Sequence, residues 1–162
     1  MICDDDLIDT FDGKYRINPQ LLVTTDLELF DHLYEEKHGI TEERNRIHKL
    51  KRAVRLYKGR VYPDAEAEHW LMAVATDYHL RFLRAEEELL ALLSIKGNYQ
   101  AICDEAKRSL CVEKGNKEVY YWMTLSLIKQ GTTESARQVV KLAKNSLTEE
   151  DYAELLGKIE HI

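Results

Sequence analysis

The chain has 162 residues, the length of one ordinary domain, and only nine of them are glycine or proline. This share is under 6%, about half of the roughly 12% that is usual for the two residues together. A many-stranded sandwich or barrel needs frequent turn residues, so the composition argues against one and favours long helices with short connections. The net charge of −6 argues against a protein that binds polyanions over its whole surface.

The cysteines and the apolar runs indicate the cellular compartment in which we expect the protein. Cys3, Cys103 and Cys111 form no CxxC pair, and an odd number of cysteines suits a reducing cytoplasm. The longest apolar runs, 71–75 and 89–93, are far shorter than the roughly 18 residues of a membrane span. We therefore expect a cytoplasmic protein without a membrane partner. Cys103 and Cys111, on one predicted helix, are expected to be small core residues.

The first predicted element is a β-hairpin over residues 7–17. Asp12-Gly13 separates two short segments of alternating polarity, and Asp-Gly tolerates the positive φ that a two-residue hairpin turn needs. An isolated hairpin is only marginally stable in water. We therefore expect this one to pack either on the helices or on a domain that the chain lacks.

Helices are predicted over the rest of the chain, because apolar residues recur there every three or four positions. Thr25 and Glu28 have the spacing of a capping box at the first helix. The third segment is long enough to form either one helix or two. The predicted segments are 25–38, 41–58, 65–96, 99–112, 117–130, 133–145 and 149–159.

An internal repeat has a period of 34 residues. Leu89 aligns with Met123 and Gly97 with Gly131, and each glycine ends one helix before a second begins. This is the period of a tetratricopeptide helix pair, although two unrelated amphipathic hairpins can align in the same way. We predict an all-α fold, a tetratricopeptide-like antiparallel helix-pair array of about seven helices preceded by a short N-terminal β-hairpin, with the repeats over about 66–162.

Residues 53–64 carry a resemblance to a known family. They read AVRLYKGRVYPD and are followed by Trp70. This run is similar to the start of the bacterial transcriptional activator domain, with its pattern A-x-x-L-Y-x-G-x, two hydrophobic residues and Pro. The chain departs from the family at Arg60, where many members are acidic, and at 114–116, where many have Asp-Pro. Residues 7–17 and 25–30 resemble the end of a winged-helix DNA-binding domain and its junction with the activator domain.

The resemblance implies a division at residues 1–22, the winged-helix remnant, and 23–162, the helical domain. It implies a regulatory and protein-interaction domain of a bacterial transcriptional activator, which mediates oligomerisation or contact with the transcription machinery. The expected partners are another protein or a second copy, and a winged-helix domain that is attached or separate. No helix-turn-helix precedes the hairpin, so we expect a fragment or an atypical member without base-specific DNA contact. The alternative is a stand-alone tetratricopeptide-type adaptor that binds a peptide and is not connected with DNA.

A basic segment dominates the charge pattern. Eight lysines and arginines and no acid lie between Arg44 and Arg60, which leaves −14 on the remainder. We favour the interpretation that this is a solvated helix face neutralised by the chain's own acids. The alternative is contact with DNA phosphates or an acidic partner. The candidate residues for that contact are Arg44, Lys51, Arg52 and Arg55.

Aromatic residues offer weaker candidates. Tyr120, Tyr121 and Trp122 cannot all face one direction on a helix. We expect Trp70, Phe82 and Trp122 in the core, and retain Tyr78 and Tyr121 as possible partner contacts. The histidines, cysteines and serines show no metal-binding or catalytic motif, and no glycine-rich phosphate loop is present. We therefore expect no enzyme, cofactor or metal site.

Overall fold

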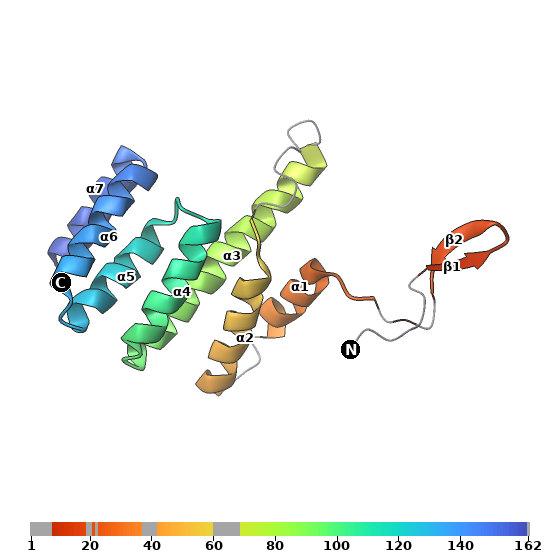
Figure 1. Ribbon diagram of the computed structural model, residues 1–162, viewed down its shortest axis with the longest axis horizontal. Helices are drawn as coiled ribbons and strands as arrows, with labels where there is room; N and C mark the ends of the chain where they lie inside the picture. The colour runs from red at the N-terminus through yellow and green to blue at the C-terminus, as the bar shows by residue number, and fades with distance from the viewer. Residues whose placement is uncertain (1–7, 19–20, 22, 37–41, 60–68, 162) are drawn as a thin grey trace.

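The computed structural model describes residues 8–18, 21, 23–36, 42–59 and 69–161 (Figure 1). Within these residues a two-stranded hairpin precedes seven α-helices that lie side by side in an array. The predicted all-α fold with a short N-terminal hairpin is thus confirmed. The elements are β1 Ile8–Phe11, β2 Lys14–Ile17, α1 Asp26–Glu36, α2 Glu43–Leu56, α3 His69–Ile95, α4 Tyr99–Val112, α5 Lys117–Lys129, α6 Thr133–Ser146 and α7 Glu149–Glu160.

The hairpin has the predicted turn. Ile8 pairs with Ile17 across the antiparallel strands. At the turn, Asp12 and Gly13 adopt φ values of 50° and 70°, the left-handed region that favours Asp-Gly. The strand side chains that the structure describes are exposed, Tyr15 to 84%, and the hairpin stands apart from the helices (Figure 1). The helices therefore do not provide the packing partner that a stable hairpin needs.

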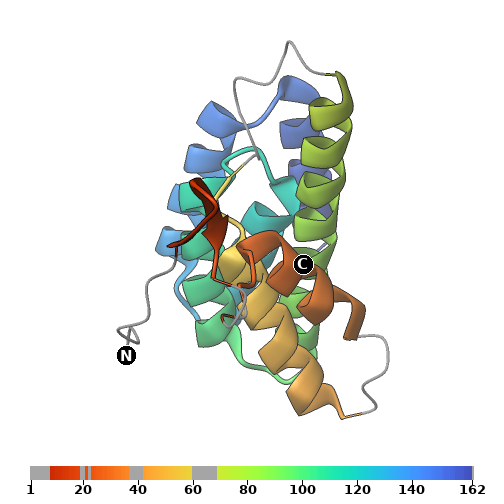
Figure 2. The ribbon, with the colours of Figure 1, turned by 90° about the vertical axis from the view of Figure 1, so that its right-hand side faces the viewer.

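The start of α1 and the length of α3 agree with the sequence pattern. Glu28 N donates to Thr25 Oγ1 at 3.2 Å, and Thr25 N donates to Glu28 Oε2 at 2.8 Å, so the predicted capping box begins α1. The long central segment is one helix, α3, whose 27 residues span about 40 Å. It runs along one edge of the array (Figure 2). α2 begins after Glu42 without a side-chain cap.

The two copies of the 34-residue repeat share one backbone motif. At the end of α3, Asn98 N donates to Leu93 O and Gly97 N to Ser94 O. The same two bonds recur 34 residues later, where Gly131 ends α5. Gly97 and Gly131 have φ values of 64° and 76°, as this type of C-cap, the Schellman motif, requires. Equivalent positions in the repeat thus reverse the chain in the same way.

The helices zigzag along the array, and one apolar core runs between them. Each even-numbered helix packs on the odd-numbered helices before and after it, and the odd-numbered helices α3, α5 and α7 also touch in sequence. The largest fully buried apolar side chains come from α2, α3, α4, α5 and α7. They are Leu50, Phe82, Leu89, Leu90, Ile102, Val119 and Leu155.

Tyr57 is the tyrosine of the pattern A-x-x-L-Y-x-G-x, and its side chain joins the end of α2 to α3. It directly follows α2 and is 8% exposed. Its ring stacks on Phe82 with the centroids 4.1 Å apart, and its hydroxyl lies 2.9 Å from Nδ1 of His79. A tyrosine fills this place because the ring is buried while the hydroxyl reaches a polar partner.

Three core expectations need correction or remain open. Among the consecutive aromatics of α5 the buried residue is Tyr120, while Trp122 is half-buried, because its position on the helix faces the edge of the core. Cys111 is exposed rather than buried. Eight residues at 100° each leave it about 80° from Cys103 around the helix. The side chain of Trp70 lies outside the described residues.

Removing part of the Leu89 side chain tests the core. Leu89 is fully buried in α3, so Leu89→Ala should lower the free energy of unfolding by about 3 kcal/mol through lost burial and a residual cavity. The matched control is Leu142→Ala on α6, where Leu142 is 60% exposed and the expected change is below about 0.5 kcal/mol. Denaturant unfolding followed by circular dichroism measures both, and equal effects would contradict the assignment of the core.

Candidate interaction surface

The outward side of α2 carries the basic segment. Leu50, Ala53 and Val54 are buried on the inner side of the helix. Arg44, His48, Arg52 and Arg55 are exposed, and their spacing of four, four and three residues places them along the opposite side. The helix therefore presents a positively charged stripe to solvent, as the amphipathic pattern predicts.

One buried carboxylate of α4 meets three cations of this region. Glu105 is only 4% exposed. Its Oε1 lies 2.9 Å from Nη2 of Arg55 and 3.2 Å from Nζ of Lys51, both on α2. Its Oε2 lies 3.7 Å from Nε of Arg108. A buried carboxylate is costly unless it is paired, and these contacts both neutralise it and tie α2 to α4.

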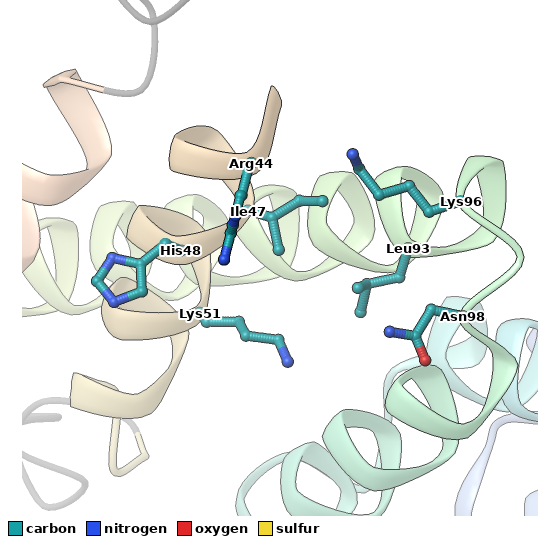
Figure 3. Close-up of a pocket in the computed structure, with 7 residues that line it drawn as sticks. All are labelled: Arg44, Ile47, His48, Lys51, Leu93, Lys96 and Asn98. Carbon is teal, nitrogen blue, oxygen red and sulfur yellow. The ribbon is translucent and has the colours of Figure 1, made fainter. Parts of the chain in front are cut away.

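A groove of about 400 Å³ lies where α2 faces the end of α3 and the start of α4 (Figure 3). Its base includes two apolar side chains, the half-buried Ile47 and the buried Leu93. Arg44, His48 and Lys51 line it from α2, and the ring of His48 points away from Leu93 and Asn98 (Figure 3). The full lining is Arg44, Ile47, His48, Lys51, Leu93, Lys96 and Asn98.

The polar lining of this groove contains no carboxylate. Lys96 Nζ lies 3.1 Å from Glu43 Oε2, an ion pair that joins the end of α3 to the start of α2. Asn98 Oδ1 accepts from Ala101 N at 3.2 Å, which caps α4 and leaves the amide NH₂ to point toward the groove (Figure 3). Arg44 has no ion-pair partner among the described residues. The side chains that line the groove are thus matched to a negatively charged ligand.

The structure separates the four predicted basic contacts into three settings. Arg44 and Lys51 both line the groove. Arg55 shares Glu105 with Lys51. Arg52 is exposed on α2 and lines neither the groove nor the Glu105 cluster. Lys51 and Arg55 therefore share one carboxylate of the chain, which compensates one of their two charges, whereas Arg44 and Arg52 face solvent.

Tyr78 packs between α1 and α3. Its hydroxyl donates to Asp31 Oδ2 at 2.6 Å, and its ring meets Phe30 edge-on. Burial and this hydrogen bond raise the pKa of Tyr78 to about 12. Arg81 also donates to Asp31, at 3.0 Å. Tyr78 is half-buried, so its main visible role is to hold α1 against α3.

Tyr121 packs between α5 and α7. Lys158 lies over its ring, 5.7 Å from the centroid, and Trp122 meets it edge-on. The ring is half-buried. The two tyrosines lie on different helix pairs, so the structure does not bring them together with each other or with the groove.

A second buried acid, Glu86, lies on α3 and faces Ser109 of α4. It is 1% exposed on α3, and Asn116 Nδ2 donates to its Oε2 at 3.0 Å. Burial raises the pKa of Glu86 to about 7, and the bond from Asn116 opposes that rise. Asn116 also caps α5, since its Oδ1 accepts from Glu118 N. Glu86 thus couples the protonation of one side chain to the packing of α3 against α5.

Sequence reasoning missed Glu105, Glu86 and Asn98. A signal for Glu105 exists, because it falls beside Ile102 and Ala106 on the apolar side of α4. A charge at such a position predicts a buried ion pair, but its partners on α2 lie some 50 residues earlier in the chain. The described part of the chain contains no group of three metal-ligating side chains and no helix that is apolar and long enough to cross a membrane.

One comparison with known proteins gives a match. The model of a family described as the bacterial transcriptional activator domain matches residues 25–154. The match begins at the capping box of α1, ends within α7 and covers about four fifths of the chain. This is a family of regulatory domains and not of enzymes. No curated protein and no solved structure matches the chain.

Neutralising Glu105 should loosen α2. Glu105→Gln leaves Lys51 and Arg55 without their counter-charge, and we expect the free energy of unfolding to fall by about 2 kcal/mol, less than for a fully buried pair because both cations keep some solvent. Glu134→Gln is the control, because its ion pair with Arg137 is exposed and should contribute below about 0.5 kcal/mol. Chemical denaturation compares the two, and a stable Glu105→Gln variant would refute the role of this cluster.

Glu86 predicts a pH dependence of stability. Its pKa is about 7 in the folded chain against an ordinary carboxyl value of 4.5, so the folded state binds the proton more tightly and stability falls as the pH rises from 4.5 to 7. The Glu86→Gln variant loses this dependence. Its free energy of unfolding relative to the original chain should therefore rise by about 3 kcal/mol over that interval.

The exposed neighbour offers the control for this pH experiment. Glu87→Gln should change the free energy of unfolding by less than about 0.5 kcal/mol at both ends of the interval. Denaturant titrations at pH 4.5 and 7.5 measure the three proteins. A constant difference between Glu86→Gln and the original chain would show that Glu86 titrates normally.

Proposed function

Since the chain belongs to the bacterial transcriptional activator domain family, we propose that its helical array is the regulatory and protein-interaction domain of a bacterial transcriptional activator. The family match over residues 25–154 is the observation that carries this proposal. In this role the array joins copies of the activator or contacts the transcription machinery. Both actions require a surface that recognises protein, and both occur in the cytoplasm.

The charge distribution supports a contact role for α2. Arg44 and Arg52 are exposed on the same helix, and a patch of unmatched positive charge raises the rate at which an acidic partner is met. The groove beside Arg44 adds apolar surface from Ile47 and Leu93. Protein interfaces combine such an apolar centre with a polar rim.

Sequence-specific DNA reading belongs, in this proposal, to a winged-helix domain that is attached or separate. The residues 1–22 would be a remnant of that domain and 23–162 the activator domain. The hairpin exposes Ile8, Tyr15 and Ile17, which is the kind of apolar surface that a neighbouring domain covers. The basic side of α2 could add contacts to DNA phosphates, but these carry no sequence information.

The second candidate function is a peptide-binding adaptor that is not connected with DNA. The observation that favours it is the groove, since a groove without carboxylates would serve an adaptor equally well. The two functions differ in one property. An adaptor has no effect on a promoter when it is carried there.

A fusion experiment separates these functions. The 162-residue chain is joined to a heterologous winged-helix domain, and promoter activity and oligomeric state are measured against the DNA-binding domain alone. We expect a several-fold change in promoter activity or a shift to a dimer. The substitution Arg44→Glu should reduce the effect, and Arg137→Glu on α6, also an exposed arginine but outside α2, should not. If neither promoter activity nor oligomeric state changes, the activator function is wrong and the adaptor function is favoured.

A further inference from the structure

We propose that the groove between α2, the end of α3 and the start of α4 binds a short acidic peptide segment that carries an aliphatic side chain between its carboxylates. The inference rests on the proposed function, because the segment would be offered by a protein partner of the activator. It goes further in naming the site and the chemistry of its ligand. Its lining comes from α2, from the end of α3 and from Asn98, which caps α4 (Figure 3).

The polar side chains that line the groove are mainly cations and hydrogen-bond donors. Arg44, Lys51 and Lys96 carry positive charge, and Asn98 turns its NH₂ group toward the groove. No carboxylate lines it. Two of the three cations also pair with carboxylates outside the lining, so the groove keeps an excess of positive charge, which disfavours a basic peptide and selects an acidic one.

Carboxylates of the chain already bind two of these cations. Glu43 pairs with Lys96 at 3.1 Å, and Glu105 pairs with Lys51 at 3.2 Å. Both lysine side chains keep part of their surface in solvent, 41% for Lys96 and 28% for Lys51. A lysine ammonium has three donors, so each can donate to a further carboxylate without releasing the first. Arg44 has no ion-pair partner within the part of the chain that the structure describes, so its guanidinium can make a bidentate contact with the ligand.

The apolar part of the lining favours a peptide over a nucleic acid as the ligand. Ile47 and Leu93 present aliphatic surface between the cations. A phosphate backbone has no apolar group to cover such a surface, whereas a leucine or isoleucine between two acidic residues does. The volume of about 400 Å³ suits a few side chains and not a duplex.

The test uses the whole chain and synthetic peptides. The probe is a short peptide in which Asp and Leu alternate, and its controls replace every Asp by Asn or every Leu by Ser. Fluorescence anisotropy gives the Kd of each peptide, and nuclear magnetic resonance follows the side-chain amide of Asn98 and the methyl groups of Ile47 and Leu93. We expect binding of the Asp–Leu peptide alone, weakened by added salt, with shifts at those three residues.

A pair of variants of the chain makes the test specific. Arg44→Gln combined with Lys96→Gln removes two cations of the groove and should weaken binding about tenfold. Arg52→Gln is the matched control, because it removes an exposed cation of the same helix that does not line the groove, and it should change the Kd less than about twofold. Thermal unfolding of both variants verifies that the fold is retained.

Several results would overturn the proposal. One is that the Asp–Leu peptide does not bind, and another is that the Asn–Leu or Asp–Ser peptide binds as tightly as it does. A third is that Arg52→Gln weakens binding as much as the double variant, and a fourth is that the chemical-shift changes are confined to α5 and α7. Binding of a DNA duplex that depends on Arg44 and Lys96, with no peptide binding, would assign the groove to phosphate instead. These outcomes are independent of the fusion experiment, which detects promoter activity and oligomeric state even when the groove is empty.

Discussion

The Glu105 carboxylate joins α2 to α4 through ion pairs with two cations of α2. α2 packs on α1 and α3 through apolar side chains, while its ionic link to α4 consists of Lys51 and Arg55 converging on this one buried acid. A buried carboxylate without counter-charges would cost several kcal/mol, so the folded state strongly favours the arrangement in which both cations reach it. The positively charged helix is therefore held in place by an acid of its own chain.

This constraint also shapes the groove. Lys51 contacts Glu105 and lines the groove at the same time, so the ion pair holds one wall of the groove against α4. The opposite wall depends on Gly97, whose positive φ ends α3 and turns Asn98 into the capping position of α4. A tertiary ion pair and a local backbone turn thus bring together cations and an amide that are distant in sequence. A side chain held in this way loses little conformational entropy when it binds the proposed peptide.

The fold was predictable to within a few residues because its signals are local. Thr25 with Glu28 begins α1, Gly97 and Gly131 end α3 and α5, and Asp12-Gly13 turns the hairpin, each through contacts within a few positions of chain. The candidate site was predictable only in part. Arg44, Lys51, Arg52 and Arg55 stand out as a basic run, but which of them is paired depends on Glu105 and on the approach of α4. The burial of Tyr120 in place of Trp122 likewise depends on how neighbouring helices pack.

The central claim is that α2 is tied to α4 by direct charge pairing with Glu105, and a double-mutant cycle tests it most directly. The free energies of unfolding of Arg55→Met, Glu105→Gln and the double variant, relative to the original chain, give the coupling between the two side chains. We predict a favourable coupling of about 1 kcal/mol or more, decreasing little in high salt because the carboxylate is buried. A coupling near zero would contradict the account.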